Sequence, residues 1–312
     1  MITLSIVVPV LNEEESIPLF LNTIKPHLDA LVPTWEIVFV DDGSTDTTRD
    51  VILHHHNLDP RICLVELSRN FGKEAALTAG LEWSRGEAVI PMDVDLQDPP
   101  EVIAEFIRLW KEGFDVVLGQ RTSRDQDTQA KRASAGAFYS LFNKISEYKI
   151  EPNVGDFRLM TREVVDATLQ LREKNRFMKG LFAWVGYKTA LVPYSRPERA
   201  AGVGKFNYWK LWNFALDGIT GFSTLPLRIW TYIGSLIAFG ALVFLLMTIV
   251  KTLFYGNDTP GYASMMSVIL FLGAAQLISL GIMGEYIGRM YKEIKNRPIY
   301  IARNVYGCSK SP

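Results

Sequence analysis

The sequence predicts an α/β domain with a mostly parallel sheet, followed by two membrane-spanning helices. Short apolar, β-rich runs alternate with helical patterns through the first part of the chain, which is typical of βαβ units. Acidic residues follow several of these runs, where a strand would end. The last third holds two almost wholly apolar runs, 229–250 and 263–284, and each is close to the ~20 residues that cross a bilayer.

The α/β elements follow from hydrophobic periodicity along the chain. Strands are expected at 4–8, 36–40, 62–67, 88–92 and 115–118. Helices are expected from Ile17 to Leu28, through Ile52, from Glu74 to Trp83, and from Glu101 after Pro99-Pro100. Further along, the sequence predicts a polar loop at 122–129, a short strand or turn at 155–159, a helix at 177–185 and a strand at 188–192.

A candidate metal site follows the fourth predicted strand. Asp93 and Asp95 are two residues apart, so both can face one cavity while Val94 faces the other way. Oxygen ligands at this spacing suit Mg²⁺ or Mn²⁺ held jointly with substrate phosphates, and Gln97 adds a neutral oxygen. The alternative is a solvated turn after a strand.

Other charged residues fall at the same predicted edge. Ligands of such sheets bind outside the carboxyl ends of the strands. Residues at these ends are Glu13, Asp41, Asp42, Lys73, Asp93 and Asp95. We therefore expect a phosphate-containing ligand held through a metal. Ordinary turn chemistry is the alternative for the stretch from Asp41 to Ser44.

Several function classes have no support in the sequence. Neither a Gly-x-Gly-x-x-Gly nor a P-loop pattern occurs, so dinucleotide and P-loop chemistry are not expected. A net charge of −1 without a basic run argues against nucleic-acid binding. The two cysteines, Cys63 and Cys308, indicate no disulfide framework and favour a reducing compartment.

The flanks of the apolar runs predict the membrane topology. The loop 252–262 lacks Lys and Arg, whereas basic residues flank the other ends of the two runs, which places both termini in the cytoplasm. The start of the chain lacks the features of a signal peptide. Residues 208–222 predict a helix lying on the membrane, or one packed on the catalytic domain. The expected organisation is a catalytic domain at 1–204, interfacial helices at 205–226, two transmembrane helices at 227–288 and a cytoplasmic tail at 289–312.

Motifs along the whole chain resemble a known family. The stretches Val7-Val8-Pro9, Asn12-Glu13, Asp41-Asp42-Gly43-Ser44 and 93–101 resemble the inverting GT-A glycosyltransferases of family two, in the polyprenyl-phosphate branch that includes dolichyl-phosphate mannose synthases. The stretches 155–160, 205–206, 226–228 and 284–289, together with two membrane helices, resemble the bactoprenol (undecaprenyl-phosphate) glucosyltransferases of O-antigen modification clusters. The resemblance implies a Rossmann-like GT-A catalytic domain.

The resemblance also implies roles for individual residues. It implies nucleotide contacts at Pro9, Glu13, Val40 and Asp42, metal ligation by Asp95 with Asp93 and Gln97 nearby, and phosphate or donor contacts from Arg121, Arg199 and Lys205. We add Asp41, Lys73 and Val94 to the nucleotide-sugar site, and Arg132 to the acceptor-phosphate site. Asp156 either orients the acceptor or acts as the base. Many relatives carry an aromatic residue where this chain has Leu11, so base stacking is in doubt.

The expected reaction is inverting transfer of one hexose, glucose by resemblance, from a UDP-sugar to undecaprenyl phosphate at the cytoplasmic face of a bacterial inner membrane. The product would supply O-antigen or cell-envelope glycan modification. Alternatives are an aminoarabinose-type or mannose-type sugar, a polymer-extruding synthase, and a non-catalytic nucleotide-sugar-binding scaffold. The Gln-x-x-Arg-Trp signature of processive synthases is absent, which favours a single transfer. Small residues in the crossings suggest self-association or a flippase partner; packing within one chain is the alternative.

Overall fold

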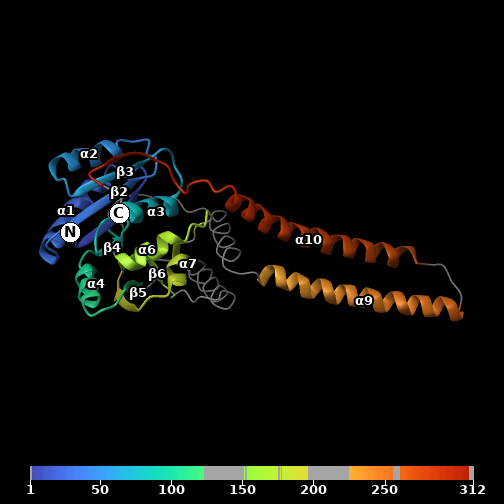
Figure 1. The fold of residues 1–312 in the computed structure, drawn as a ribbon. Helices are drawn as coiled ribbons and strands as arrows, with labels where there is room; N and C mark the ends of the chain where they lie inside the picture. The colour runs from blue at the N-terminus through green and yellow to red at the C-terminus, as the bar shows by residue number, and fades with distance from the viewer. Residues whose placement is uncertain are drawn as a thin grey trace. The chain divides into compact units, whose positions relative to one another are not determined.

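The computed structural model describes residues 2–122, 151, 153–174, 176, 178–195, 225–255 and 261–308. The chain divides into two units (Figure 1). One unit comprises Met1–Gly218 together with Arg297–Pro312, and the other comprises Ile219–Asn296. The first contains the predicted α/β elements, and the second contains the two predicted apolar runs.

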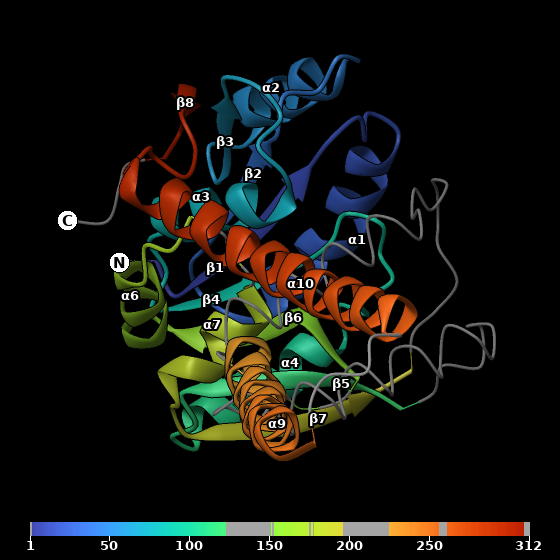
Figure 2. The same ribbon diagram turned by 90° about the vertical axis from the view of Figure 1, so that its right-hand side faces the viewer.

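The described part of the first unit holds one eight-stranded sheet in the order β7-β5-β6-β4-β1-β2-β3-β8. Its strands are β1 (Leu4–Val10), β2 (Trp35–Asp41), β3 (Ile62–Leu67), β4 (Ala88–Pro91), β5 (Val116–Arg121), β6 (Val154–Thr161), β7 (Thr189–Tyr194) and β8 (Ala302–Tyr306). Figure 2 shows this order, with β8 at one edge of the sheet and β7 at the other.

The strand directions confirm the predicted mostly parallel α/β fold. β4, β1, β2 and β3 run parallel, as do β5 and β7, whereas β6 runs antiparallel between β4 and β5. Reversal of β6 places its first residues beside the last residues of β5, with Gln120 opposite Val154. Side chains at the start of β6 therefore reach the edge at which the parallel strands end.

Helices cover both faces of the sheet (Figure 1). They are α1 (Ser16–Leu31), α2 (Thr48–Leu58), α3 (Lys73–Trp83), α4 (Val102–Lys111), α6 (Arg162–Gln170) and α7 (Met178–Val185). One core includes the buried rings of Phe20 on α1, Phe39 on β2 and Phe106 on α4. A second core joins Val40 of β2 to Ala76 and other apolar residues of α3. The sheet is thus buried on both faces, as expected for parallel strands.

The C-terminal segment returns to the sheet as β8, which pairs antiparallel with β3. The Tyr300 hydroxyl donates to Glu82 Oε2 at 2.6 Å and accepts from Trp83 Nε1 at 3.1 Å. The sequence predicts only a tail at 289–312, so strand β8 is an addition to the expected fold.

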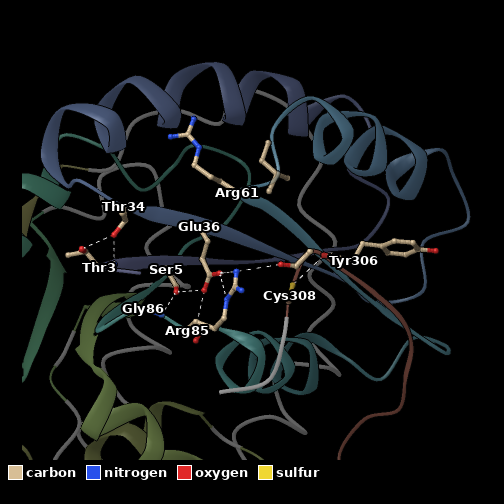
Figure 3. A network of polar contacts seen from close by, with 12 residues as sticks. Thr3, Ser5, Thr34, Glu36, Arg61, Arg85, Gly86, Tyr306 and Cys308 are labelled. Atoms are coloured by element: carbon tan, nitrogen blue, oxygen red, sulfur yellow. Dashed lines mark hydrogen bonds and ion pairs between the residues drawn. The ribbon is translucent and has the colours of Figure 1, made fainter. Parts of the chain in front are cut away.

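Fully buried Glu36 accepts hydrogen bonds from Ser5 Oγ at 2.7 Å and Arg85 Nη2 at 2.6 Å (Figure 3).

The second unit contains two long helices, α9 (Leu225–Tyr255) and α10 (Tyr262–Ile294), which pack against each other. Among the described residues, one segment, Phe271–Ile294, is long and apolar enough to cross a membrane. Large apolar side chains are exposed on both helices, including Leu236, Phe244 and Leu277. The second crossing stays a prediction. Residues 205–224, most of the predicted interfacial segment, lie outside the described residues.

Helix α3 approaches the sheet closely at Gly80. A Cβ atom at this position would lie 2.2 Å from Val7 Cγ1 and 3.1 Å from Val40 Cγ2. Real Cβ atoms essentially never come as close as the first of these distances, so any larger residue must displace its neighbours. The glycine therefore sets the distance between α3 and the sheet, and with it the position of Lys73 at the start of α3.

We predict that Gly80→Ala lowers the thermal unfolding temperature of the full chain. Alanine gains about 1 kcal/mol of helix propensity over glycine, but overpacking a filled core costs about 1–3 kcal/mol. Adding Val7→Ala removes the atom that the new methyl group meets, so the double variant should lose less stability than the two single losses added together. Stability of Gly80→Ala equal to or above that of the parent would contradict this packing.

Candidate active site

A cavity of about 240 Å³ opens at the edge where the parallel strands end. It is lined by the last residues of β1 and those just after it, by residues that follow β2 and β4, and by the first turn of α3. The lining residues are Pro9, Val10, Leu11, Glu13, Asp42, Lys73, Ala76, Asp93, Val94 and Asp95. The structure therefore brings together seven of the predicted site residues, from four separate segments of the chain.

Asp42 joins the end of β2 to the loop before α3. Its carboxylate accepts hydrogen bonds from the backbone N–H groups of Phe71, at 2.7 Å, and Gly72, at 2.9 Å. Burial raises the pKa of Asp42 above its usual range, although these two bonds act in the opposite direction. Gly72 has a φ of 99°, which glycine adopts without strain, and α3 begins at the next residue. Asp42 thus holds the turn that delivers Lys73 to the cavity.

Asp41 and Glu13 organise the neighbouring turns. Asp41 is 2% exposed, and its Oδ1 accepts from the Ser44 backbone N–H at 2.9 Å. Glu13 Oε2 accepts from Ser16 Oγ at 2.7 Å, and the Glu13 N–H donates to Thr48 Oγ1 at 2.8 Å. Asp41 therefore stabilises this turn, and its contact with the donor stays a prediction, whereas Glu13 also lines the cavity.

Lys73 forms the central electrostatic contact of the site. Its ammonium group lies 2.6 Å from Asp93 Oδ1 and 3.2 Å from Asp156 Oδ2. Burial acts to lower the pKa of Lys73, but Asp156 and Asp93 outweigh it and raise the pKa above the usual value for lysine. Burial acts to raise the pKa of Asp156, but Lys73, Lys179 and Arg158 lower it to about 2. Lys73 and Asp156 are therefore both charged near neutral pH.

Asp95 and Gln97 lie in a tight turn after β4. Asp95 Oδ1 accepts from the Gln97 backbone N–H at 3.2 Å, and Leu96 between them has a φ of 55°. Gln97 is 8% exposed and does not line the cavity, whereas Asp93 and Asp95 do. Among the described residues, no three His, Cys, Asp or Glu side chains form a metal-binding group. Two cavity carboxylates fit Mg²⁺ or Mn²⁺ if substrate phosphates complete the shell.

The remaining predicted residues are less central or lie outside the described residues. Val40 is fully buried, and its side chain faces Gly80 of α3 rather than the cavity. Arg121 ends β5, and its Nε donates to the Tyr194 hydroxyl at 3.4 Å. The predicted acceptor-phosphate residues Arg132, Arg199 and Lys205 lie outside the described residues.

Two residues near the site were not predicted from the sequence. Glu74 Oε2 accepts from the Met178 backbone N–H at 3.2 Å, and burial, with the nearby Asp156 charge, raises the pKa of Glu74 to about 7. Its position directly after Lys73 was the available signal. Tyr194 ends β7, and its hydroxyl donates to Asp98 Oδ1 at 2.7 Å. The distance along the chain between these two residues left no local signal for that contact.

Comparison with known proteins decides the family. The sequence pattern of Glycosyl transferase family 2 matches residues 5–169, which include the cavity and the Lys73 bridge. The chain belongs to glycosyl transferase family 2. A second pattern, the GtrB C-terminal hairpin, matches residues 225–290, which contain α9 and most of α10. This glycosyltransferase therefore combines a GT-A-like α/β domain with a C-terminal helical hairpin.

Several relatives match this family 2 glycosyltransferase along nearly its whole length. The SfII prophage-derived bactoprenol glucosyl transferase of Shigella flexneri is 53% identical over 96% of this chain and 97% of its own. A prophage bactoprenol glucosyl transferase homolog of Escherichia coli is 52% identical over 97% and 99%. The crystal structure of glucosyl-3-phosphoglycerate synthase from Mycobacterium tuberculosis with Mn²⁺ and UDP-glucose is 21% identical, with a TM-score of 0.46 over 70% of this chain and 77% of that chain. The resemblance to bactoprenol glucosyltransferases is confirmed.

We predict that Lys73→Met destabilises the protein by on the order of 1 kcal/mol, as for a partly exposed ion pair, because Asp93 and Asp156 then lose the cation that bridges them. Mn²⁺ should restore more thermal stability to this variant than it adds to the parent, since the ion can neutralise the two aspartates that have lost their lysine. Lys111→Met, at the exposed end of α4, is the control and should show neither effect. Equal responses of all three proteins to Mn²⁺ would contradict a divalent-ion site at Asp93.

Proposed function

We propose that this glycosyltransferase transfers a single glucose from UDP-glucose to undecaprenyl phosphate at the cytoplasmic face of a bacterial inner membrane. The observation that carries the proposal is the 53% identity with a bactoprenol glucosyl transferase over 96% of the chain. The acidic cavity at the strand ends supports a nucleotide-sugar donor, and the apolar helix at Phe271–Ile294 supports access to a lipid acceptor.

The donor would bind along the cavity, with its base near Pro9, Leu11 and Asp42 and its diphosphate near Asp93 and Asp95. A divalent ion held by these two aspartates would neutralise the charge that develops on the leaving diphosphate. Leu11 offers the base an apolar contact only, since it has no ring to stack. Lys73 would meet the phosphates with the one N–H donor that Asp93 and Asp156 leave.

The acceptor is a phosphate monoester whose second pKa is about 6, so it is already largely ionised at neutral pH. Asp156 has a pKa of about 2 beside Lys73, which makes it a weaker base than the acceptor phosphate. The charge balance therefore favours an orienting role for Asp156 over proton abstraction. In-line attack by the phosphate would invert the anomeric centre and give a β-linked lipid sugar from an α-linked donor.

The membrane arrangement belongs to the same proposal. We assign α9 and α10 to two crossings, with the catalytic domain and both termini in the cytoplasm, as the basic flanks predict. Arg132, Arg199 and Lys205 would neutralise the acceptor phosphate. Delivery of the lipid-linked sugar to a flippase partner, and self-association through small residues of the hairpin, remain part of the proposal.

The test uses membranes that contain the full chain, incubated with undecaprenyl phosphate and several labelled UDP-sugars, with and without Mg²⁺ or Mn²⁺. We predict one lipid-linked sugar, formed from UDP-glucose, and loss of the product when the ions are chelated. Another preferred donor would revise the sugar. A polymeric product would contradict single transfer, and donor binding without any lipid product would favour the scaffold alternative.

Asp95→Ala should reduce lipid-linked glucose formation at least about a hundredfold, since removal of one group that stabilises transition-state charge has this size of effect. Asp50→Asn is the matched control because Asp50 pairs only with Arg49 among the described residues and is exposed. Both variants should reach the membrane in parental amounts, measured by immunoblotting of the membrane fraction. Parental turnover by the Asp95→Ala variant would remove the metal assignment.

A further inference from the structure

Tyr194 joins two parts of the site that are far apart in the sequence. It is the last residue of β7, where it lies opposite Arg121, the last residue of β5. Thr122, the residue after Arg121, also contacts Tyr194: its N–H and its Oγ1 both donate to the Tyr194 carbonyl oxygen, at 2.9 Å and 3.1 Å. The ends of β5 and β7 are therefore fixed to each other at the edge where the cavity lies.

The Tyr194 hydroxyl lies between a carboxylate and a guanidinium group. It donates to Asp98 Oδ1 at 2.7 Å and accepts from Arg121 Nε at 3.4 Å. Asp98 is 3% exposed and lies three residues after Asp95, at the end of the tight turn that follows β4. A buried carboxylate is costly unless donors satisfy it, so the short bond from Tyr194 fixes this turn.

The ring of Tyr194 is held independently of its hydroxyl group. It packs edge-on against Phe157, with ring centroids 5.6 Å apart and an interplanar angle of 81°. A Cβ at Gly119 of β5 would lie 3.0 Å from both rings, so the glycine leaves room for them. Burial raises the pKa of Tyr194, and the Asp98 carboxylate acts in the same direction, so the hydroxyl keeps its proton and remains a donor.

We propose that Tyr194 is a positioning residue for the donor site, whose hydroxyl ties the turn that carries Asp95 to Arg121 and so sets the distance between the metal-binding aspartate and the donor-binding arginine. The inference rests on the proposed function, which places Asp95 near the donor diphosphate, and on the donor contact that the family resemblance implies for Arg121. Tyr194 itself lines no part of the described cavity, so its effect passes through these two residues.

The test compares Tyr194→Phe with the parent as full-length protein in membranes or detergent. Phenylalanine keeps the ring and its packing and removes only the hydroxyl group. We expect the KM for UDP-glucose and the half-saturating Mn²⁺ concentration to rise about five- to tenfold, the size expected when one buried hydrogen bond is lost. The KM for undecaprenyl phosphate should stay within twofold of the parent, and kcat should change less than the donor KM.

Tyr306→Phe is the matched control. The Tyr306 hydroxyl accepts from Arg49 Nη2 at 3.2 Å, but Tyr306 belongs to β8, the outermost strand on the side of the sheet away from β7. This variant should keep the parental donor KM. The double variant Tyr194→Phe with Asp98→Ala should show no more than the larger of the two single effects on donor KM, because phenylalanine removes the donor and alanine the acceptor of the same bond.

An unchanged donor KM in Tyr194→Phe would overturn the inference, as would an equal rise in Tyr306→Phe. A fall in kcat and rises in the KM values for both substrates, all of similar size, would overturn it too if the unfolding temperature also falls by a large amount. Such a result indicates a general structural role. Calorimetric binding of UDP with Mn²⁺ needs no lipid acceptor. If the parent transfers no sugar, the proposed function fails, and the UDP affinities of the two variants still decide the role of Tyr194.

Discussion

The structure depends on one electrostatic constraint. Several carboxylates lie close together where the strands of the sheet end, and their mutual repulsion must be offset. Lys73 satisfies this constraint by contacting Asp93 at 2.6 Å and Asp156 at 3.2 Å. Asp93 follows β4, Asp156 lies on the reversed strand β6, and the lysine begins α3. A group that neutralises two carboxylates lets them lie close together at the strand ends, where under the proposed function a divalent ion and a diphosphate would bind.

The surrounding fold serves this arrangement through close packing. Gly80 allows α3 to lie against β1 and β2, and Asp42 fixes the turn from which α3 starts. Reversal of β6 brings Asp156 to the edge where β4 ends, which a wholly parallel sheet would not do at this position. The donor site thus rests on rigid elements of the sheet and its helices, which favours a fixed geometry for the reacting groups.

The sequence predicts those parts of the fold that depend on local patterns. The run from Ile62 to Leu67 is apolar and β-rich, and it forms a strand with these bounds. Asp93 and Asp95 could be placed at the cavity because they directly follow a buried run. Strand β8 could not be predicted because it is short and half polar. It forms by pairing with β3, which lies far away in the sequence: Asn304 Nδ2 donates to Glu66 Oε2, 238 positions earlier. The Lys73 bridge to Asp156 and the Tyr194 bond to Asp98 depend on strand order in the same way. The side chain of Val40 faces α3, so its donor contact stays a prediction.

Location of the divalent ion tests the central claim most directly. Crystals of the full chain grown with UDP and Mn²⁺, measured at the manganese absorption edge, would show the ion by its anomalous scattering. The account predicts one peak at coordination distance, about 2.1 Å, from carboxylate oxygens of Asp93 or Asp95 and from the UDP phosphates. Manganese bound elsewhere, or UDP bound in the cavity with both aspartates free of the ion, would contradict it.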